Sequence, residues 1–227
     1  IEDHFSGHFI YYKPKDIVSG DFYAFLKKGP YVMIAVADCT GHGVPGALMS
    51  MIGSNMLNQA IIEHDITQPS AILQEMNANI TSILRQHESE TRDGMDVALC
   101  TINIETLEGQ YAGANRPLWL MSNQQLTEIK PDKKPIGGYF ETVSHVYTNH
   151  RMQLKKGDTF YLFSDGLIDQ FGGPNGKKYT SRRLKEFLIA NKDQSLALQG
   201  KLLQDVFENW QGKQEQIDDV CMIGISV

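Results

Sequence analysis

Short apolar runs separated by turn residues extend along most of the chain, and they predict β-strands. Turn signals such as Glu108-Gly109 and Lys156-Gly157-Asp158 divide the runs. Because most of these strands follow one another through short turns, we expect antiparallel sheets. The expected strands are Phe9–Tyr12, Phe22–Lys27, Tyr31–Asp38, Val97–Ile104, Gln110–Gly113, Leu118–Ser122, Leu126–Ile129, Thr142–Thr148, Thr159–Ser164 and Val220–Val227.

Helical periodicity appears in two consecutive pairs of segments, and the pairs do not alternate with the strands. The first pair is Val44–His64 and Pro69–His87, where Pro69 suits a first helical position. The second pair is Ser181–Ala190 and Ser195–Trp210. This order predicts an α+β fold with sheets packed together and helices outside.

A predicted hairpin brings two aspartates face to face. Lys27-Lys28-Gly29-Pro30 lies between two apolar runs and is typical of a hairpin turn. A turn centred between Gly29 and Pro30 pairs Asp21 with Asp38, with their Cα atoms roughly 5 Å apart. Two carboxylates this close repel each other unless one is protonated or a cation lies between them.

A second pair of aspartates is expected from the far end of the chain. Asp165 directly follows the apolar strand that ends at Ser164, and Asp218-Asp219 directly precedes the last strand. If these strands are antiparallel, Asp165 and Asp218 meet at one edge of a sheet. An aspartate at a strand end is usually only a turn residue. Four of them on strongly apolar strands favour a site for Mg²⁺ or Mn²⁺, which prefer oxygen ligands and activate water toward phosphorus.

The segment Gly41–Gly46 matches the G-x-G-x-x-G pattern of dinucleotide-binding turns, since it follows a strand and opens a helix. Asp38 lies just before it, where a carboxylate would repel a pyrophosphate. The helix is also followed by another helix, so the parallel βαβ unit is absent. Glu63 and Asp65 lie at about the right distance for a ribose-binding acid, but no second strand carries them. We therefore favour a role for these glycines other than nucleotide binding.

Composition narrows the class of protein further. The chain has 227 residues, 41% of them hydrophobic, and a net charge of −6, which argues against nucleic acid or an anionic membrane surface as the main partner. Three cysteines, widely spaced, form neither a disulfide framework nor a zinc motif, so we expect a reducing, cytoplasmic environment. No apolar run is long enough to insert in a membrane. The abrupt start at Ile1 suggests a single domain, 1–227, excised from a longer regulatory protein.

Four segments together resemble a known family in order and spacing. They are Val18-Ser19-Gly20-Asp21-Phe22-Tyr23, Val36–Ala47 (VADCTGHGVPGA), Phe163-Ser164-Asp165-Gly166-Leu167 and Ile217-Asp218-Asp219-Val220. The family is that of SpoIIE/RsbU-type phosphatases, within the metal-dependent (PPM, type 2C) serine/threonine protein phosphatases. Tyr111–Leu118 (YAGANRPL) and Pro135-Ile136-Gly137-Gly138 also resemble its middle motifs.

The resemblance implies a four-layer α/β/β/α sandwich of two antiparallel sheets flanked by helix pairs. It implies two Mn²⁺ or Mg²⁺ ions, with a third left open, and a catalytic role for Asp38 and Asp165 through a metal-bridging water. Asp38 would bridge the ions, and the remaining ligands would be Asp21, Asp165, Asp218 and the backbone carbonyl of Cys39. Residues Asp219, Gly20, His42 and Lys13 would be supporting members of the site.

The resemblance also implies a phosphorylated substrate protein of the anti-sigma-factor-antagonist type and control by an upstream sensor or linker domain, with a homodimer left open. The domain would be cytoplasmic, alone or as part of a membrane-anchored sensor. A catalytically weak signalling module of the same fold and a two-metal phosphoesterase for small molecules are the alternatives. All four metal aspartates are present, which disfavours the signalling module.

Several positions depart from the family pattern. Thr40 stands where animal relatives have a general-acid histidine, and His42 is at least as well explained as a loop residue that orients the glycine turn. No arginine precedes Asp21 to hold phosphate; Lys13 and Lys15 are substitutes, although ordinary solvated strand-end charges explain them better. Asn115 replaces a frequent histidine, and Asp169 replaces a frequent glutamate. The basic loop Gly172–Lys178 is either a flap that meets the substrate protein or only a long turn.

Overall fold

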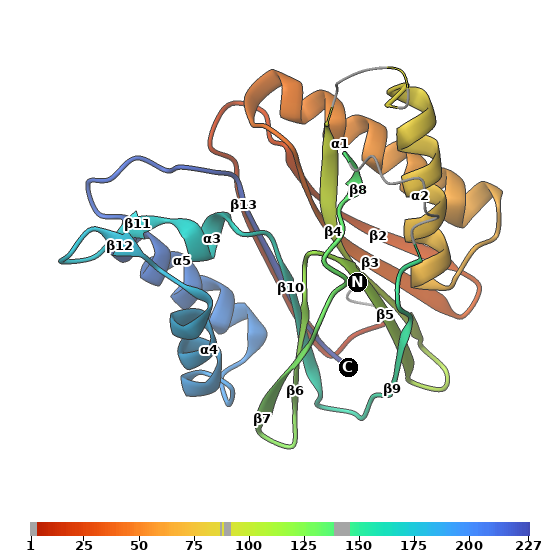
Figure 1. Ribbon diagram of the computed structural model, residues 1–227. Helices are drawn as coiled ribbons and strands as arrows, with labels where there is room; N and C mark the ends of the chain where they lie inside the picture. The colour runs from red at the N-terminus through yellow and green to blue at the C-terminus, as the bar shows by residue number, and fades with distance from the viewer. Residues whose placement is uncertain (1–3, 87, 89–91, 139–145) are drawn as a thin grey trace.

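Two antiparallel sheets form the centre of the molecule (Figure 1). The computed structural model describes residues 4–86, 88, 92–138 and 146–227. The first sheet has five strands in the order β1-β13-β10-β6-β7. Their bounds are β1 Gly7–Lys13, β13 Val220–Ser226, β10 Thr159–Phe163, β6 Leu118–Ser122 and β7 Gln125–Ile129.

The second sheet has six strands, five of them in the order β2-β3-β4-β5-β9, with β8 paired to β4. Their bounds are β2 Asp21–Lys28, β3 Tyr31–Cys39, β4 Gly94–Asn103, β5 Glu108–Ala114, β8 Ile136–Gly137 and β9 His150–Gln153. A separate two-stranded ribbon joins β11 (Phe171–Gly172) to β12 (Lys177–Lys178).

Helices cover the outer face of each sheet (Figure 1). Against the second sheet lie α1 (Gly43–Asn58), its π-helical continuation η1 (Gln59–Glu63) and α2 (Pro69–Ile83). Against the first sheet lie α4 (Ser181–Ala190) and α5 (Leu196–Gln211), and the short α3 (Gly166–Asp169) follows β10. Within the described residues, no helix combines the length and apolar character needed to cross a bilayer.

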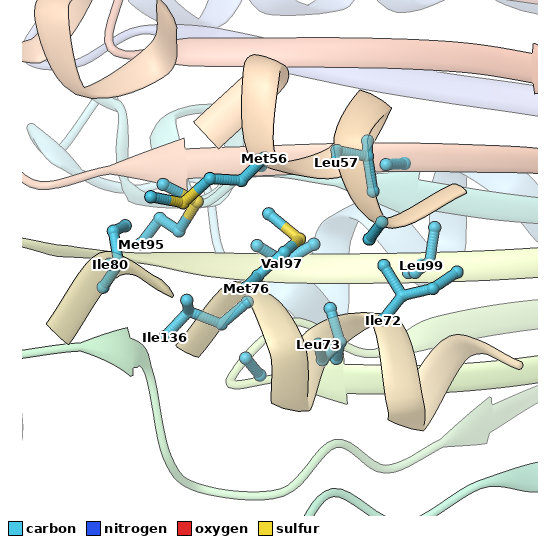
Figure 2. Packing of buried hydrophobic residues seen from close by; sticks show 14 of the residues in the cluster. Met56, Leu57, Ile72, Leu73, Met76, Ile80, Met95, Val97, Leu99 and Ile136 are labelled. Atoms are coloured by element: carbon cyan, nitrogen blue, oxygen red, sulfur yellow. The ribbon is translucent and has the colours of Figure 1, made fainter. Parts of the chain in front are cut away.

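Three hydrophobic cores separate the four layers. Val97 and Leu99 of β4 pack toward α1 and α2 (Figure 2). Met33 and Ala35 of β3 belong to the same core, whereas Val32 and Ile34 point into the core between the sheets. The third core joins the first sheet to α4 and α5, with Phe207 among its members. Because β3 is buried on both faces, its sequence is a continuous apolar run instead of an alternating one. The predicted α/β/β/α sandwich is confirmed.

Most predicted elements are present, and two of them need correction. A strand was predicted at Thr142–Thr148; residues 142–145 lie outside the described part, residues 146–148 are not in a strand, and β9 begins at His150. The helix predicted to reach residue 87 ends at Ile83. The basic loop Gly172–Lys178 lies within the β11–β12 hairpin, and it is called the flap below.

The glycines of the Gly41–Gly46 segment allow two backbones to approach closely. A Cβ atom on Gly46 would lie 2.3 Å from the Gly41 carbonyl oxygen, and one on Gly20 would lie 2.4 Å from the same atom. Gly41 also has a φ of 81°, which favours glycine. Moreover, β3 pairs antiparallel with both of its neighbours. The glycine pattern thus packs the β3–α1 turn against Gly20, and the nucleotide-binding interpretation has no support in the fold.

Candidate metal centre

The hairpin between β2 and β3 has the register that its turn residues predict. Gly29 and Pro30 form the turn, Lys28 pairs with Tyr31, and Asp21 pairs with Asp38 at the far end. The carboxylates of Asp21 and Asp38 therefore project from adjacent strands of the second sheet. Asp21 is only 3% exposed, and its buried Oδ2 atom has no hydrogen-bond partner among the described residues.

The second aspartate pair comes from the first sheet. Strands β10 and β13 are antiparallel, with Phe163 opposite Met222. Asp165, after β10, and Asp218, before β13, therefore lie at the same end of the two strands. Ser164 holds these two strand ends together, because its hydroxyl oxygen accepts a hydrogen bond from the Cys221 backbone N–H at 3.0 Å. The Asp165 and Asp218 charges also act on Asp21, which means that the two sheets bring both pairs into one cluster.

Crowding changes the protonation of the buried carboxyl groups. Burial is the main cause that raises the pKa of Asp21 to about 7. A hydrogen bond with Ser164 opposes this shift, and the charges of Asp219, Asp218 and Asp165 add to it. Burial, and next the charge of Asp21, raises the pKa of Asp38 to about 9. The pKa of Asp218 is also raised by burial and by Asp165. A divalent cation would remove this cost, because it favours the charged carboxylates.

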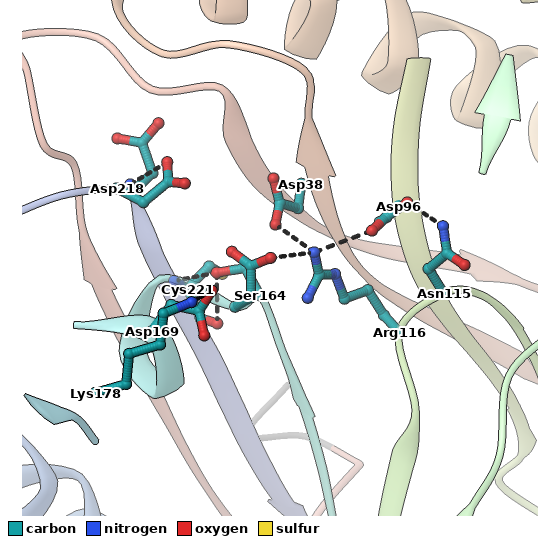
Figure 3. A network of polar contacts seen from close by, with 11 residues as sticks. Asp38, Asp96, Asn115, Arg116, Ser164, Asp169, Lys178, Asp218 and Cys221 are labelled. Atoms are coloured by element: carbon teal, nitrogen blue, oxygen red, sulfur yellow. Dashed lines mark hydrogen bonds and ion pairs between the residues drawn. The ribbon is translucent and has the colours of Figure 1, made fainter. Parts of the chain in front are cut away.

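Two further residues complete the cluster, and sequence reasoning did not assign them to the site. Asp96 lies opposite Asp38 in the β3–β4 pairing, and burial raises its pKa. Arg116 follows the left-handed Asn115 and extends between the sheets. One nitrogen of Arg116, Nη2, lies 3.0 Å from Asp38 Oδ2, 2.9 Å from Asp96 Oδ2 and 2.6 Å from Asp165 Oδ2 (Figure 3).

The supporting residues of the sequence prediction have different positions. Asp219 is 2% exposed, and its two oxygens accept from the backbone N–H groups of Lys15 at 2.7 Å and Gly20 at 2.8 Å. Asp219 therefore fixes the loop that leads into Asp21, and Gly20 is part of that anchor. Cys39 is buried at the end of β3, and its carbonyl oxygen would lie 3.4 Å from a Cβ atom on Gly20.

His42 and Lys13 do not reach the aspartate cluster. His42 lies half-exposed between Asp16, at 2.8 Å from Nδ1, and Lys15, at 3.1 Å from Nε2. This arrangement agrees with a loop histidine and not with a general acid. The Lys13 ammonium donates to Gln211 on α5 at 3.3 Å and lies 5.0 Å from the centre of the Phe207 ring. Lys13 is thus directed toward α5, which corrects the view of it as a phosphate-binding substitute.

The side chains that could bind a metal suit a hard divalent cation, although the Arg116 guanidinium lies among them. Within the described residues, no three His, Cys, Asp or Glu side chains already surround a common point as they would around an ion. The available donors are carboxylate oxygens, which Mg²⁺ and Mn²⁺ prefer. The buried, unpartnered Oδ2 of Asp21 is an acceptor still open to such an ion. The described free cysteines are all buried, and burial raises the pKa of the Cys39 thiol, so thiolate ligands are disfavoured.

Gly166 packs against the backbone of Asp219, just before β13, and so sets the distance between Asp165 and that strand. A Cβ atom on Gly166 would lie 1.9 Å from the backbone oxygen of Asp219, which neither side can avoid without a backbone shift. We expect Gly166→Ala to lower the free energy of unfolding by about 1–3 kcal/mol, measured by denaturant titration. Gly7→Ala is the matched control, because its Cβ meets only Leu196 at 3.9 Å. Equal stability of the two variants would contradict the prediction.

The arrangement of two antiparallel sheets with helices outside matches solved PP2C-type phosphatase domains. The family model of stage II sporulation protein E, SpoIIE, matches residues 28–227. The chain therefore belongs to the SpoIIE family of PP2C-type serine/threonine phosphatases, which are metal-dependent enzymes. The family resemblance of the sequence motifs is confirmed.

Individual relatives agree with this assignment. The chain is 31% identical over 162 residues to phosphoserine phosphatase RsbU of Bacillus subtilis, a match that spans 69% of this chain and 44% of RsbU. The chain therefore spans less than half of the length of that relative. The PP2C domain of SiaA from Pseudomonas aeruginosa has a TM-score of 0.88 and 33% identity, over 97% of this chain and 85% of that domain. The SpoIIE structure from Bacillus subtilis shares the fold, with a TM-score of 0.78, 19% identity, and coverage of 97% of this chain and 62% of that one.

Proposed function

We propose that this domain hydrolyses phosphoserine or phosphothreonine on a bacterial regulatory protein, in a reaction that depends on Mn²⁺ or Mg²⁺. One observation carries the proposal: acidic side chains from both sheets crowd together, and Asp21 retains a buried oxygen without a partner. As a further part of the proposal, residues 1–227 form one domain of a longer protein, and an upstream sensor or linker controls it. The proposal leaves open whether the domain forms a homodimer.

Asp38 is central to the proposed ion site, because it faces Asp21 within the second sheet and shares the Arg116 contact with Asp165 of the first. Asp21 and the Cys39 carbonyl would serve one side of the site, and Asp165 and Asp218 the other. Once bound, the ions would activate a water for attack on phosphorus and neutralise the phosphate. Asp219 would hold the loop before Asp21 in place, since both of its oxygens bind backbone N–H groups.

The proposed substrate is a phosphoprotein of the anti-sigma-factor-antagonist type. RsbU, with which the chain shares 31% identity, is named a phosphoserine phosphatase. A basic cleft of about 770 Å³ beside the flap supports a protein substrate: it is lined by Phe171 and by the cations Lys177, Lys178, Arg182 and Arg183, among others. Asp169, one helical turn after Asp165, accepts from Lys178 at 2.8 Å and so joins this flap to the proposed centre.

Metal removal tests the proposed function directly. With a phosphoserine peptide and with p-nitrophenyl phosphate, we expect hydrolysis in millimolar Mn²⁺, loss of activity in EDTA, and recovery when Mn²⁺ is added back. Asp165→Ala should remain inactive in Mn²⁺. Undiminished hydrolysis in EDTA would exclude the metal-dependent reaction. No hydrolysis in either condition would favour a binding module, and faster turnover of a dinucleotide would favour a small-molecule phosphoesterase.

Charge reversal in the basic cleft separates protein recognition from chemistry. We expect Lys177→Glu combined with Arg182→Glu to raise KM for a phosphoprotein with an acidic segment by about tenfold, since like charges then oppose docking. The rate with p-nitrophenyl phosphate should stay within about twofold, because this substrate is too small to reach the cleft. Lys156→Glu combined with Lys201→Glu, at two exposed positions outside the cleft, makes the same change in net charge and is the control. Equal KM values for both changes would argue against the cleft as a docking surface.

A further inference from the structure

Arg116 is held among carboxylates that come from both sheets. A single guanidinium nitrogen contacts Asp38 on β3, Asp96 on β4 and Asp165 at the end of β10 (Figure 3). Arginine usually donates two parallel hydrogen bonds from its guanidinium group to the two oxygens of one carboxylate. Here three carboxylates share one nitrogen, and in the part of the chain that the structure describes the buried Nε atom has no hydrogen-bond partner. A guanidinium shared in this way neutralises a cluster of carboxylates, whereas a structural ion pair joins one arginine to one carboxylate.

The backbone of Arg116 is anchored independently of its guanidinium. The Arg116 N–H donates to the Ala114 carbonyl at 2.7 Å, and the Arg116 carbonyl accepts from the Tyr111 hydroxyl at 2.5 Å. Asn115, with a φ of 58°, places the turn, and its side chain donates to Asp96 at 2.7 Å. The guanidinium can therefore change partners while the loop stays in position.

A divalent cation and the Arg116 guanidinium would compete for the same carboxylate oxygens of Asp38 and Asp165. An ion about 2.1 Å from the Asp38 and Asp165 oxygens would lie within roughly 5 Å of Nη2, which is itself 3.0 and 2.6 Å from those oxygens. At that separation, in a site whose Arg116 side chain is 13% exposed, the like charges repel strongly. Ion binding to these oxygens therefore favours departure of the guanidinium from at least one of the two carboxylates.

We propose that Arg116 exchanges partners: it neutralises Asp38 and Asp165 while no ion is bound, and it binds the substrate phosphoryl group once an ion displaces it. The proposal rests on the metal-dependent function above. After displacement, Arg116 remains tethered beside Asp38, where the phosphoryl group would be attacked. Its planar fork matches phosphate oxygens. Arg116 would thus supply a phosphate ligand that Lys13 does not, since Lys13 is directed toward α5.

The exchange predicts effects of opposite sign in one variant. Arg116→Gln should bind Mn²⁺ on the order of tenfold more tightly in calorimetry, because its competitor is gone. At saturating Mn²⁺, the same variant should show a KM for a phosphoserine peptide on the order of tenfold higher. Arg151→Gln, which removes an exposed arginine paired with Glu108 at 3.8 Å, is the charge-matched control and should change neither value. Mn²⁺ affinity that is unchanged or weakened in Arg116→Gln would overturn the proposal, as would an unchanged KM.

A measurement on the unaltered protein covers the case in which Arg116→Gln does not fold. In ¹⁵N spectra of arginine side chains, the Arg116 signal is identified by its absence from Arg116→Lys. Saturating Mg²⁺ should shift this signal and increase its exchange with water; an unchanged signal in the ion-saturated protein would overturn the proposal. If the unaltered protein binds neither Mn²⁺ nor Mg²⁺, the metal-dependent function fails as well. Failure of the partner exchange alone instead leaves ion binding and hydrolysis intact.

Discussion

Asp38→Asn is expected to reduce kcat for a phosphoserine peptide by at least about three orders of magnitude at saturating Mn²⁺. Asp38 faces Asp21 across the hairpin and shares the Arg116 nitrogen with Asp165, so it is the residue through which both sheets contribute to the site. Asparagine keeps the size of the side chain but lacks the negative charge that an ion requires. Steady-state kinetics over a Mn²⁺ titration provide the measurement.

The control for this change is Asp205→Asn, on the exposed face of α5. It removes the same charge and should leave kcat within about twofold of the unaltered enzyme, as expected for a surface position. Circular dichroism should show that both variants fold. If Asp38→Asn retains more than about a tenth of the activity, Asp38 is not the central ligand of the site.

The ion-free protein is expected to lose stability as pH rises from about 4 to about 9. The pKa of Asp21 is raised from 3.8 to about 7 in the folded state, chiefly by burial, and that of Asp38 to about 9. A raised pKa means that the folded state keeps a proton that the unfolded chain has already released. The contribution is therefore fully present below the unfolded pKa and is lost as pH passes through the folded values. The total loss is on the order of several kcal/mol.

Thermal unfolding in EDTA between pH 5 and 9 measures this effect, and a decrease of Tm by about 10 °C is expected. Asp21→Asn should flatten the part of the curve below pH 7, whereas Asp205→Asn should leave the slope as it is. Saturating Mn²⁺ should raise Tm most at high pH, because the ion binds ionised carboxylates of the folded state. An ion-free Tm that stays constant or rises over this range would contradict the crowding of the carboxylates.

The hairpin and the last strand show which parts of the site a sequence can predict. A two-residue turn at Gly29 and Pro30 fixes the register, so the pairing of Asp21 with Asp38 follows from local residues alone. Asp165 and Asp218 were predicted to meet because each adjoins a strongly apolar strand, and β10 and β13 do pair antiparallel. Local signals thus provided four of the acidic residues.

Asp96 and Arg116 were missed because their positions depend on long-range pairing. Strands β3 and β4 are separated in sequence by both helices of the α1–α2 pair, so no turn sets the register that places Asp96 beside Asp38. Arg116 lies in a loop after a left-handed residue, where neither helical nor strand periodicity applies. The one available signal was that Arg116 lies in the segment Tyr111–Leu118, which resembles a middle motif of the family. To place it in the site would have required knowledge of how the sheets pack.

The edge elements were the least predictable parts of the fold. Strand β9 has the sequence His150-Arg151-Met152-Gln153 and pairs on one side only, with β5, so its mostly polar pattern does not mark it as a strand. Helix α3 has only four residues, too few for a 3.6-residue period to appear. In both cases tertiary contacts, and not local preference, decide the structure.

Asp38 and Asp165 belong to different sheets, and more than half of the chain separates them in sequence. An ion bound to both would act as a reversible cross-link, comparable to a disulfide that closes a long loop. Chelation would open that cross-link without breaking a covalent bond. The two halves of the sandwich should then separate more readily, and the protein should be cleaved faster by proteases when no ion is bound.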